Sequence, residues 1–265
     1  MTRLFKKLGA NEIGRDFVLG DIHGAYDLVI QGMREVRFNG HKDRLLVVGD
    51  LIDRGPGSHR VLEFLQQPYV HAVRGNHDHD FCQVSLEELK VLASINWNGL
   101  GWVKDVPDEK LLAIQIELSR LPVAIEVQTN RGTVGLVHAD VPAGMDWGSF
   151  VQALDRADAE VLDIALTGRD RLQRRDETGV AGVGRVYVGH TIQWSGPRQL
   201  GNVWCIDTGA VFRELDKDRG SLTMVNMLFR TGVLAPTSVQ HVFTHEEGAD
   251  EPFGASRCQR PQGEF

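Results

Sequence analysis

The feature that most constrains the fold of this 265-residue chain is a series of short apolar runs, each ending in a polar cluster. Short runs rich in Val, Ile and Leu and bounded by Gly and Asp are typical of buried β-strands. Because open α/β sheets bind their ligands at the carboxyl ends of their strands, the polar clusters predict a site at a sheet edge. The runs are DFVLGDIHG (16–24), RLLVVGDLIDRG (44–55), YVHAVRGNHD (69–78), TVGLVHAD (133–140), RVYVGHT (185–191) and NVWCIDTGAVF (202–212).

Helical patterns separate the predicted strands. Apolar residues recur at helix spacing over 25–36, and another helix is expected around 61–65 behind a cap at Ser58. The sequence SLEE at 85–88 predicts a capping box, and a further helix is expected from Asp108 to about Arg120, ahead of a proline. The segment 82–121 is therefore a predicted helical insertion, placed where it could cap the site.

The composition is that of an ordinary globular chain, with 42% hydrophobic and 25% charged residues. We expect one domain over 1–244 and a loosely ordered polar tail over 245–265. No apolar run reaches the roughly eighteen residues of a membrane span, and no apolar stretch follows the basic start, so a cytoplasmic protein without membrane contact is predicted. The formal net charge of −7 gives no basic surface for nucleic acid, and the three cysteines have no C-x-x-C spacing.

Five predicted strand ends carry, in chain order, residues suited to metal binding and catalysis. Each motif alone is weak evidence of such a site, because Asp, Asn and His are common in turns and helix caps. Their repetition at successive strand ends is hard to attribute to chance. A carboxylate on a central strand can bridge two divalent cations, and Asp50 is the predicted bridge. The other predicted ligands are Asp21 and His23 for one cation, and Asn76, His138 and His190 for the second.

The mixed oxygen and nitrogen donor set, without thiolate, favours Mn, Fe, Co or Zn over Mg. A water between two such ions loses a proton near neutral pH and becomes a nucleophile. A histidine held by a carboxylate is then suited to protonate the leaving oxygen, and His77 with Asp53 is the predicted pair. The remaining histidines are expected to be surface or structural residues; they are His41, His59, His71, His79, His241 and His245.

Arginines next to these motifs predict a phosphate-bearing substrate. Arg54 follows Asp53, and its planar guanidinium can donate two hydrogen bonds to phosphate oxygens. A second arginine is expected in LTGRDRLQRRDETG, where spacing alone does not choose among Arg169, Arg171, Arg174 and Arg175.

The series GDIHG, GDLIDRG, RGNHD, HAD and GHT resembles the phosphoprotein phosphatase family of metallophosphoesterases, in particular its bacteriophage lambda phosphatase-like bacterial serine/threonine branch. The resemblance covers 17–227 and implies a central β-sandwich of mixed sheets flanked by helices, with two metals that are often Mn²⁺. It further implies direct hydrolysis of phosphomonoesters by a metal-bridging hydroxide, with His77 as the acid beside Asp53. The implied ligands are Asp21, His23 and Asp50 for the first metal, and Asp50, Asn76, His138 and His190 for the second.

The resemblance also bears on the second arginine and on the substrate. LTGRDRL is similar to the phage-type motif W-x-R-x-R-L, which places Arg169 at the phosphate although Thr167 replaces the Trp. The implied substrate is a protein or peptide carrying phosphoserine or phosphothreonine, and phosphotyrosine or phosphohistidine would also fit the chemistry. Its phosphoryl oxygens are expected to contact Arg54, Arg169 and Asn76.

Three alternatives stay open. GNHD, with Asp78, and RGPGS resemble bacterial diadenosine tetraphosphate hydrolases, a dinucleoside polyphosphate class that commonly lacks the Asp53 of DRG. A phosphodiesterase is a weaker alternative, since those branches commonly end in G-H-x-H whereas Ile192 stands at the last position here. The third is a catalytically inactive binding protein, against which stands the complete set of predicted ligands.

Overall fold

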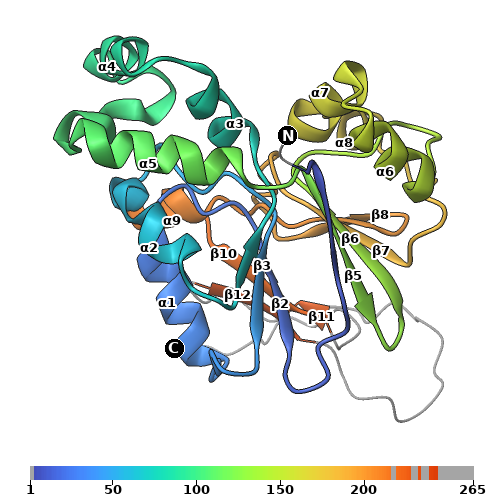
Figure 1. Cartoon of the computed structure of the whole chain (residues 1–265). Coiled ribbons are helices and arrows are strands. Elements are labelled where there is room, and N and C mark those ends of the chain that lie inside the picture. Colours follow the sequence, from blue (N-terminus) through green and yellow to red (C-terminus); the bar gives the residue numbers. More distant parts are fainter. Residues whose placement is uncertain (1–2, 216–218, 228–231, 234–238, 244–265) are drawn as a thin grey trace, which may run out of the picture.

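Within the part of the chain that the structure describes, two mixed β-sheets of six strands each form the centre of the protein (Figure 1). The computed structural model describes residues 3–215, 219–227, 232–233 and 239–243. The first sheet has the order β1 (Phe5–Leu8), β5 (Ala124–Thr129), β6 (Gly132–Val137), β7 (Arg185–Val188), β9 (Val203–Cys205), β8 (Arg198–Leu200). The second has the order β11 (Gly232–Val233), β12 (Val239–Phe243), β10 (Leu222–Asn226), β2 (Asp16–Leu19), β3 (Arg44–Val47), β4 (Val70–Ala72). The predicted α/β fold with a central sandwich of mixed sheets is confirmed.

The central strands β2, β3 and β7 are buried on both faces over nearly their whole length, which explains their continuous apolar runs. Leu45 and Val47 of β3 pack in the core between the second sheet and the helices on its outer face. Leu46 of the same strand packs between the two sheets. Tyr187 of β7 enters the same inter-sheet core from the other side. All six predicted strands are present, as β2, β3, β4, β6, β7 and β9. The pattern missed β1 and β5 because Lys6, Lys7, Glu126 and Gln128 interrupt their apolar character.

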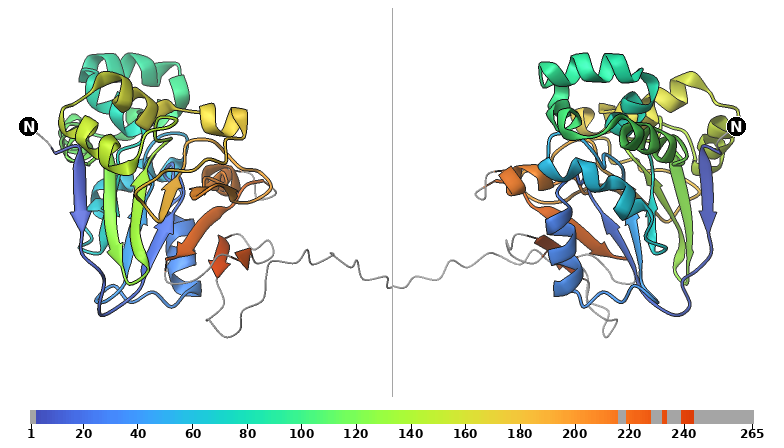
Figure 2. Two further views of the ribbon diagram at one scale, coloured as in Figure 1. Left: turned by 90° about the vertical axis from the view of Figure 1, so that its right-hand side faces the viewer. Right: turned by 60° about the vertical axis from the view of Figure 1, so that its left-hand side comes forward.

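Helices lie along the outer face of the second sheet, whereas those beside the first sheet cover only one end of it (Figure 2). Those beside the second sheet are α1 (Tyr26–Glu35), η1 (Pro56–Arg60), α2 (Val61–Leu65), α3 (Asn76–Gln83), α4 (Leu86–Ser94), η2 (Trp97–Asp105), α5 (Asp108–Ser119) and α9 (Ala210–Leu215). Those beside the first sheet are α6 (Trp147–Asp155), α7 (Ala159–Thr167) and α8 (Asp170–Arg174). The two groups α3–α5 and α6–α8 lie at the same end of the sandwich (Figures 1 and 2).

The predicted insertion is helical and its expected capping box is present. The Oγ of Ser85 accepts a hydrogen bond from the Glu88 amide at 3.2 Å, and the Glu88 carboxylate accepts one from the Ser85 amide at 2.9 Å. The predicted cap at Ser58 is wrong. Pro56 begins the 3₁₀ helix η1 earlier in the chain, and Ser58 lies inside it, donating its hydroxyl to the Gly55 carbonyl oxygen.

The register of the parallel strands places the predicted motifs side by side. Leu19 of β2 lies opposite Val47 of β3, and Val47 lies opposite Ala72 of β4, so the three polar clusters that follow begin at one edge. In the other sheet, β6, β7 and β9 are also parallel to one another. The expected tail over 245–265 lies outside the described residues. Among the described residues, no helix combines the length and apolar character needed to cross a bilayer.

Candidate metal and phosphoryl-transfer site

Sharp turns after the strands direct the polar side chains toward one another. Left-handed backbone, uncommon for residues other than glycine, occurs at several of these positions. They are His23 (φ 46°), Asp50 (φ 48°), Asp53 (φ 70°), Arg54 (φ 66°) and His190 (φ 64°). Such strain concentrates at functional sites, where the surrounding fold must enforce it.

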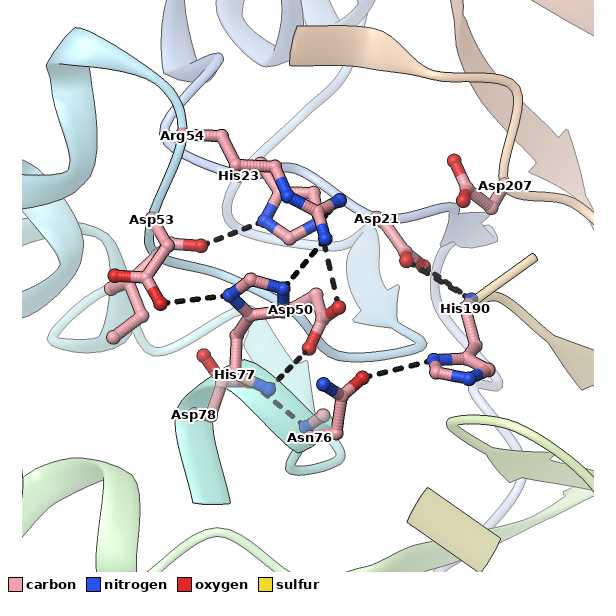
Figure 3. Close-up of polar contacts among 12 residues, drawn as sticks. Asp21, His23, Asp50, Asp53, Arg54, Asn76, His77, Asp78, His190 and Asp207 are labelled. Carbon is pink, nitrogen blue, oxygen red and sulfur yellow. Dashed lines mark hydrogen bonds and ion pairs between the residues drawn. The ribbon is translucent and has the colours of Figure 1, made fainter. Parts of the chain in front are cut away.

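Backbone hydrogen bonds join the strand ends to each other. The amide of His23 donates to the Asp50 carbonyl oxygen at 2.8 Å, which connects the turns after β2 and β3. The amide of Gly189 donates to the His138 carbonyl oxygen at 2.7 Å, which connects the ends of β6 and β7. The Asp21 carboxylate then accepts the amide of His190 at 3.0 Å and links the two sheets (Figure 3).

Two clusters of potential metal ligands meet at Asp50. The first cluster comprises His23, Asp50 and His77, and the second comprises Asp50, His138 and His190, with the ligand atoms of each cluster within 4.8 Å of one another. Asp50 Oδ2 lies 3.4 Å from His23 Nε2 and 3.5 Å from His138 Nε2. Asp50 thus belongs to both clusters, and the first cluster contains His77, which was predicted to be the acid and not a ligand. Asp21 belongs to neither cluster and lies beside His190 instead (Figure 3).

The histidine tautomers fit metal binding. Nδ1 of His23 lies 2.8 Å from the Ile52 carbonyl oxygen, and Nδ1 of His138 lies 2.8 Å from the Val48 carbonyl oxygen. A carbonyl only accepts, so each Nδ1 carries the hydrogen and each Nε2 presents a lone pair to the site, the arrangement usual for metal-binding histidines. Burial lowers the pKa of His138, and it lowers that of His23 to about 3, which keeps both rings neutral.

The amide oxygen of Asn76 makes the strongest case for a cation. Its Oδ1 lies 3.1 Å from Nε2 of His138 and 2.9 Å from Nδ1 of His190 (Figure 3). Because His138 carries its hydrogen on the other nitrogen, lone pairs face each other at the 3.1 Å contact without a hydrogen between them. A divalent cation there would be bound by both atoms and would remove the repulsion.

The buried carboxylates also call for positive charge. Burial and the carboxylates of Asp207 and Asp50 raise the pKa of Asp21 well above its ordinary value. Burial raises the pKa of Asp207 to about 7, and the charge of Asp50 adds to the rise. At Asp50, burial works in the same direction but is outweighed by the imidazoles of His138, His77 and His23, so its pKa is lowered. Cations at this site would stabilise the ionised form of all three acids.

Two glycines allow the carboxylates to approach the backbone. A Cβ added at Gly75 would lie 2.1 Å from Asp50 Oδ1, and one added at Gly189 would lie 1.9 Å from Asp21 Oδ1. Asp78 fixes the same region by accepting the amides of Gly75 at 2.9 Å and Leu51 at 3.0 Å. The carboxylate of Asp78 thereby ties the start of α3 to the turn that carries Asp50.

His77 lies between an acid and an arginine. Its Nδ1 is 2.8 Å from Asp53 Oδ2, and its Nε2 is 2.7 Å from an Nη of Arg54 (Figure 3). Burial alone would lower the pKa of His77, but the carboxylates of Asp50 and Asp53 outweigh it and raise that pKa. The other Nη of Arg54 lies 2.9 Å from His23 Nε2, so the guanidinium spans the two rings. His77 differs from the other histidines of the two clusters in that its Nδ1 contacts a carboxylate, whereas theirs contact a backbone carbonyl or the Asn76 amide.

The four candidate arginines have different surroundings. Arg171 is buried and its Nε lies 2.8 Å from Asp140 Oδ1, so it is committed to an internal ion pair. Arg174 forms an exposed pair with Asp170, and Arg175 is exposed at the end of α8. Arg169 is exposed and donates to Thr191 Oγ1 at 3.0 Å. Burial, His138 and the charge of Arg169 all lower the pKa of His190. Arg169 therefore lies near the site.

Sequence reasoning missed two residues. Asp207 follows β9 and lies close to Asp21 in the site (Figure 3). It is the only acid of the predicted strand run NVWCIDTGAVF, but no function was predicted for it. Trp102 donates its indole N–H to Asp53 Oδ1 at 2.9 Å. It comes from η2, inside the predicted insertion, and no local pattern in the sequence links it to Asp53.

A two-sheet sandwich whose strand ends gather Asp, His and Asn side chains defines a class, the metal-dependent phosphoesterases. A model described as calcineurin-like phosphoesterase matches residues 17–176, and the chain belongs to that family, whose members use divalent metals. Serine/threonine-protein phosphatase 1 of Salmonella typhimurium is 35% identical over 214 residues, covering 79% of this chain and 93% of the relative. The predicted family is thus confirmed.

Two further similarities concern another substrate class. A symmetrical bis(5'-nucleosyl)-tetraphosphatase of Klebsiella pneumoniae is 39% identical over 84 residues, which are 31% of this chain and 27% of the relative. A crystal structure provisionally assigned as a diadenosine tetraphosphatase superposes with a TM-score of 0.58 at 23% identity, covering 85% of this chain and 94% of that one. At that identity the structural likeness shows the shared fold alone.

Proposed function

We propose that this protein is a divalent-metal-dependent serine/threonine protein phosphatase. The observation that supports the proposal is the Asp53–His77 pair at 2.8 Å, in which His77 also belongs to one of the metal-ligand clusters and contacts Arg54. The similarity to a bacterial serine/threonine phosphatase over 79% of the chain supports it, whereas the similarity to the tetraphosphatase covers 31%. An inactive binding protein would have no need to keep the strained backbone at Asp50 and His190.

The proposed metal ligands are those predicted from the sequence. One cation would be held by Asp21, His23 and Asp50, and the other by Asp50, Asn76, His138 and His190. When bound, the cations supply Lewis-acid activation of water and of the phosphoryl group. The neutral imidazoles and oxygen donors would suit Mn²⁺, Fe, Co or Zn, and the family resemblance favours Mn²⁺ among them.

The chain's own residues bind the phosphoryl group and move the proton. Arg54, Arg169 and the amide of Asn76 contact the phosphoryl oxygens and oppose their charge. Asp53 accepts the Nδ1–H of His77, and Nε2 lies 2.7 Å from an Nη of Arg54. In the proposed reaction Arg54 turns to the phosphoryl oxygens, which frees Nε2 to carry the proton. As water forms the new P–O bond and the ester P–O bond breaks, His77 gives the proton on Nε2 to the leaving oxygen. No covalent phosphoenzyme is required.

The proposal also includes the domain bounds and the cellular compartment that were predicted from the sequence. The catalytic domain comprises 1–244, of which the family match covers residues 17–176. Cys82 and Cys205 are free thiols in the described part of the chain, which agrees with a reducing, cytoplasmic compartment. Phosphotyrosine or phosphohistidine would be accepted by the same residues, because the contacts proposed here are to the phosphoryl group.

The test is phosphate release with added Mn²⁺ and an EDTA control, comparing kcat/KM for a phosphoserine peptide and diadenosine tetraphosphate on one preparation. A large preference for the peptide is expected. A large preference for the dinucleotide would refute the protein phosphatase and assign the protein to the tetraphosphatase class, to which 84 of its residues are similar. Activity toward neither, with metal bound, would favour a binding protein.

A further inference from the structure

The 3₁₀ helix η2 contacts the turn that carries Asp53 and Arg54. The amide of Arg54 donates to the Gly99 carbonyl oxygen at 3.0 Å. Gly99 has φ 89°, and a Cβ added there would lie 2.4 Å from the Arg54 nitrogen, so only glycine permits this approach. An element of the insertion is therefore packed directly against two residues of the proposed catalytic machinery.

Trp102 of η2 completes the hydrogen bonding of the Asp53 carboxylate. Its Nε1–H donates to Oδ1 at 2.9 Å, while Oδ2 accepts from His77 Nδ1 at 2.8 Å. Asp53 is 4% exposed, so water cannot readily replace a lost donor. The indole ring stacks on Phe81 of α3, with centroids 5.5 Å apart and planes at 18°, which fixes the position of the N–H.

We propose that Trp102 is a positioning residue, whose indole N–H orients the Asp53 carboxylate so that His77 delivers its proton to the leaving oxygen. The inference rests on the proposed function, because it assumes that His77 is the acid. It adds that a segment outside the strand-end motifs determines how well the acid works on substrates with poor leaving groups.

The physical reason is that a carboxylate with one partner can rotate, whereas one held at both oxygens cannot. Asp53 has strained left-handed backbone, with φ 70°, and its carboxylate is attached by few rotatable bonds. Without the indole N–H, Oδ1 would be a buried acceptor without its donor, and the carboxylate would turn toward any other donor. His77 would then lose its alignment, and small misalignments of an acid are costly for catalysis.

The test compares Trp102→Phe with a matched control. Phenylalanine removes the N–H and keeps an aromatic ring against Phe81. Trp147→Phe is the control, because Trp147 also donates its indole N–H to a buried carboxylate, Glu126 Oε2 at 2.8 Å, but in the core beneath α6, away from the site. Both variants lose the same kind of bond, so an effect on stability alone should be common to both.

Trp102→Phe with Mn²⁺ is expected to lower kcat about tenfold for phenyl phosphate and a phosphoserine peptide, which is part of the roughly 10²- to 10⁴-fold effect of a positioned acid. Its KM should stay within about twofold, and kcat for p-nitrophenyl phosphate, whose leaving group hardly needs a proton, should fall less than about threefold. Trp147→Phe should change both kinds of substrate equally. Equal losses with Trp102→Phe, or none, would overturn the inference.

A second pair of measurements separates this inference from the proposed function. If Trp102 acts through Asp53, adding Trp102→Phe to Asp53→Asn should cause no further loss on phenyl phosphate, and an undiminished tenfold loss would overturn the inference. If Asp53→Asn alone keeps full activity on phenyl phosphate, the proposed function of the pair is wrong. If Trp102→Phe does not fold, 3-benzothienylalanine at 102, which has the same shape without N–H, is expected to show the same selective loss.

Discussion

Replacing Arg171 by alanine is expected to destabilise the fold, whereas replacing Arg169 should weaken substrate binding. Arg171 and Asp140 are 5% and 6% exposed, and the pair is joined at 2.8 Å, with a further Arg171 donor 3.3 Å from the Val141 carbonyl oxygen. Removing one partner of a buried pair typically costs about 3–5 kcal/mol, because the other charge stays buried without compensation.

The cost should fall near the lower limit, because Asp140 can take up a proton. Burial raises the pKa of Asp140 even though Arg171 opposes the rise, so loss of Arg171 must raise that pKa further. A carboxyl whose pKa is raised on folding contributes stability that is lost as the pH rises through the folded pKa. At about 3 kcal/mol, and about 2–4 °C per kcal/mol for a chain of this size, the expected fall in Tm is roughly 6–12 °C.

The assay is thermal unfolding at fixed metal concentration, paired with KM for p-nitrophenyl phosphate. Arg171→Ala should unfold at lower temperature, more so at pH 8 than at pH 5.5, with KM within about twofold of the parent. Arg169→Ala, an exposed site, should keep its Tm and raise KM about tenfold, as expected for one lost charged hydrogen bond. An unchanged Tm with a raised KM for Arg171→Ala would show that the phosphate-binding assignment is displaced by two residues.

Three further outcomes are expected. Asp50→Asn should lose both metals in elemental analysis and nearly all turnover, because the carboxylate lies in both ligand clusters; a fully active variant would contradict the bridge. In EDTA, the unfolding free energy should fall on the order of 1 kcal/mol between pH 6.5 and 8, since burial raises the pKa of Asp207 and Asp78 to about 7, and Mn²⁺ should reduce this slope in denaturant titrations. Ser85→Ala should cost about 1 kcal/mol in the same titrations by removing the cap that Glu88 completes, with kcat unchanged.

Several features of the fold were predictable because they depend on local pattern. The strands β2 and β3 are buried on both faces, and short apolar runs bounded by Gly and Asp are typical of such strands. The capping box at Ser85 is likewise a local hydrogen-bonding pattern. The strand β5 escaped prediction because Glu126 lies within it, and the partners that allow this acid to be buried include Trp147, which is 21 residues away and donates to it.

The sequence by itself determined the order of the ligand types and the family, because side chains at the carboxyl ends of parallel strands gather at one edge of their sheet. Only the tertiary structure brought the two sheets together so that Asp21 lies beside His190. The sequence could not choose between Arg169 and Arg171. Only the tertiary structure decided that Arg171 is paired inside the protein with Asp140, 31 residues away, and that Trp102 reaches Asp53 across 49 residues. Such contacts depend on how distant segments pack, and spacing along the chain carries no information about packing partners.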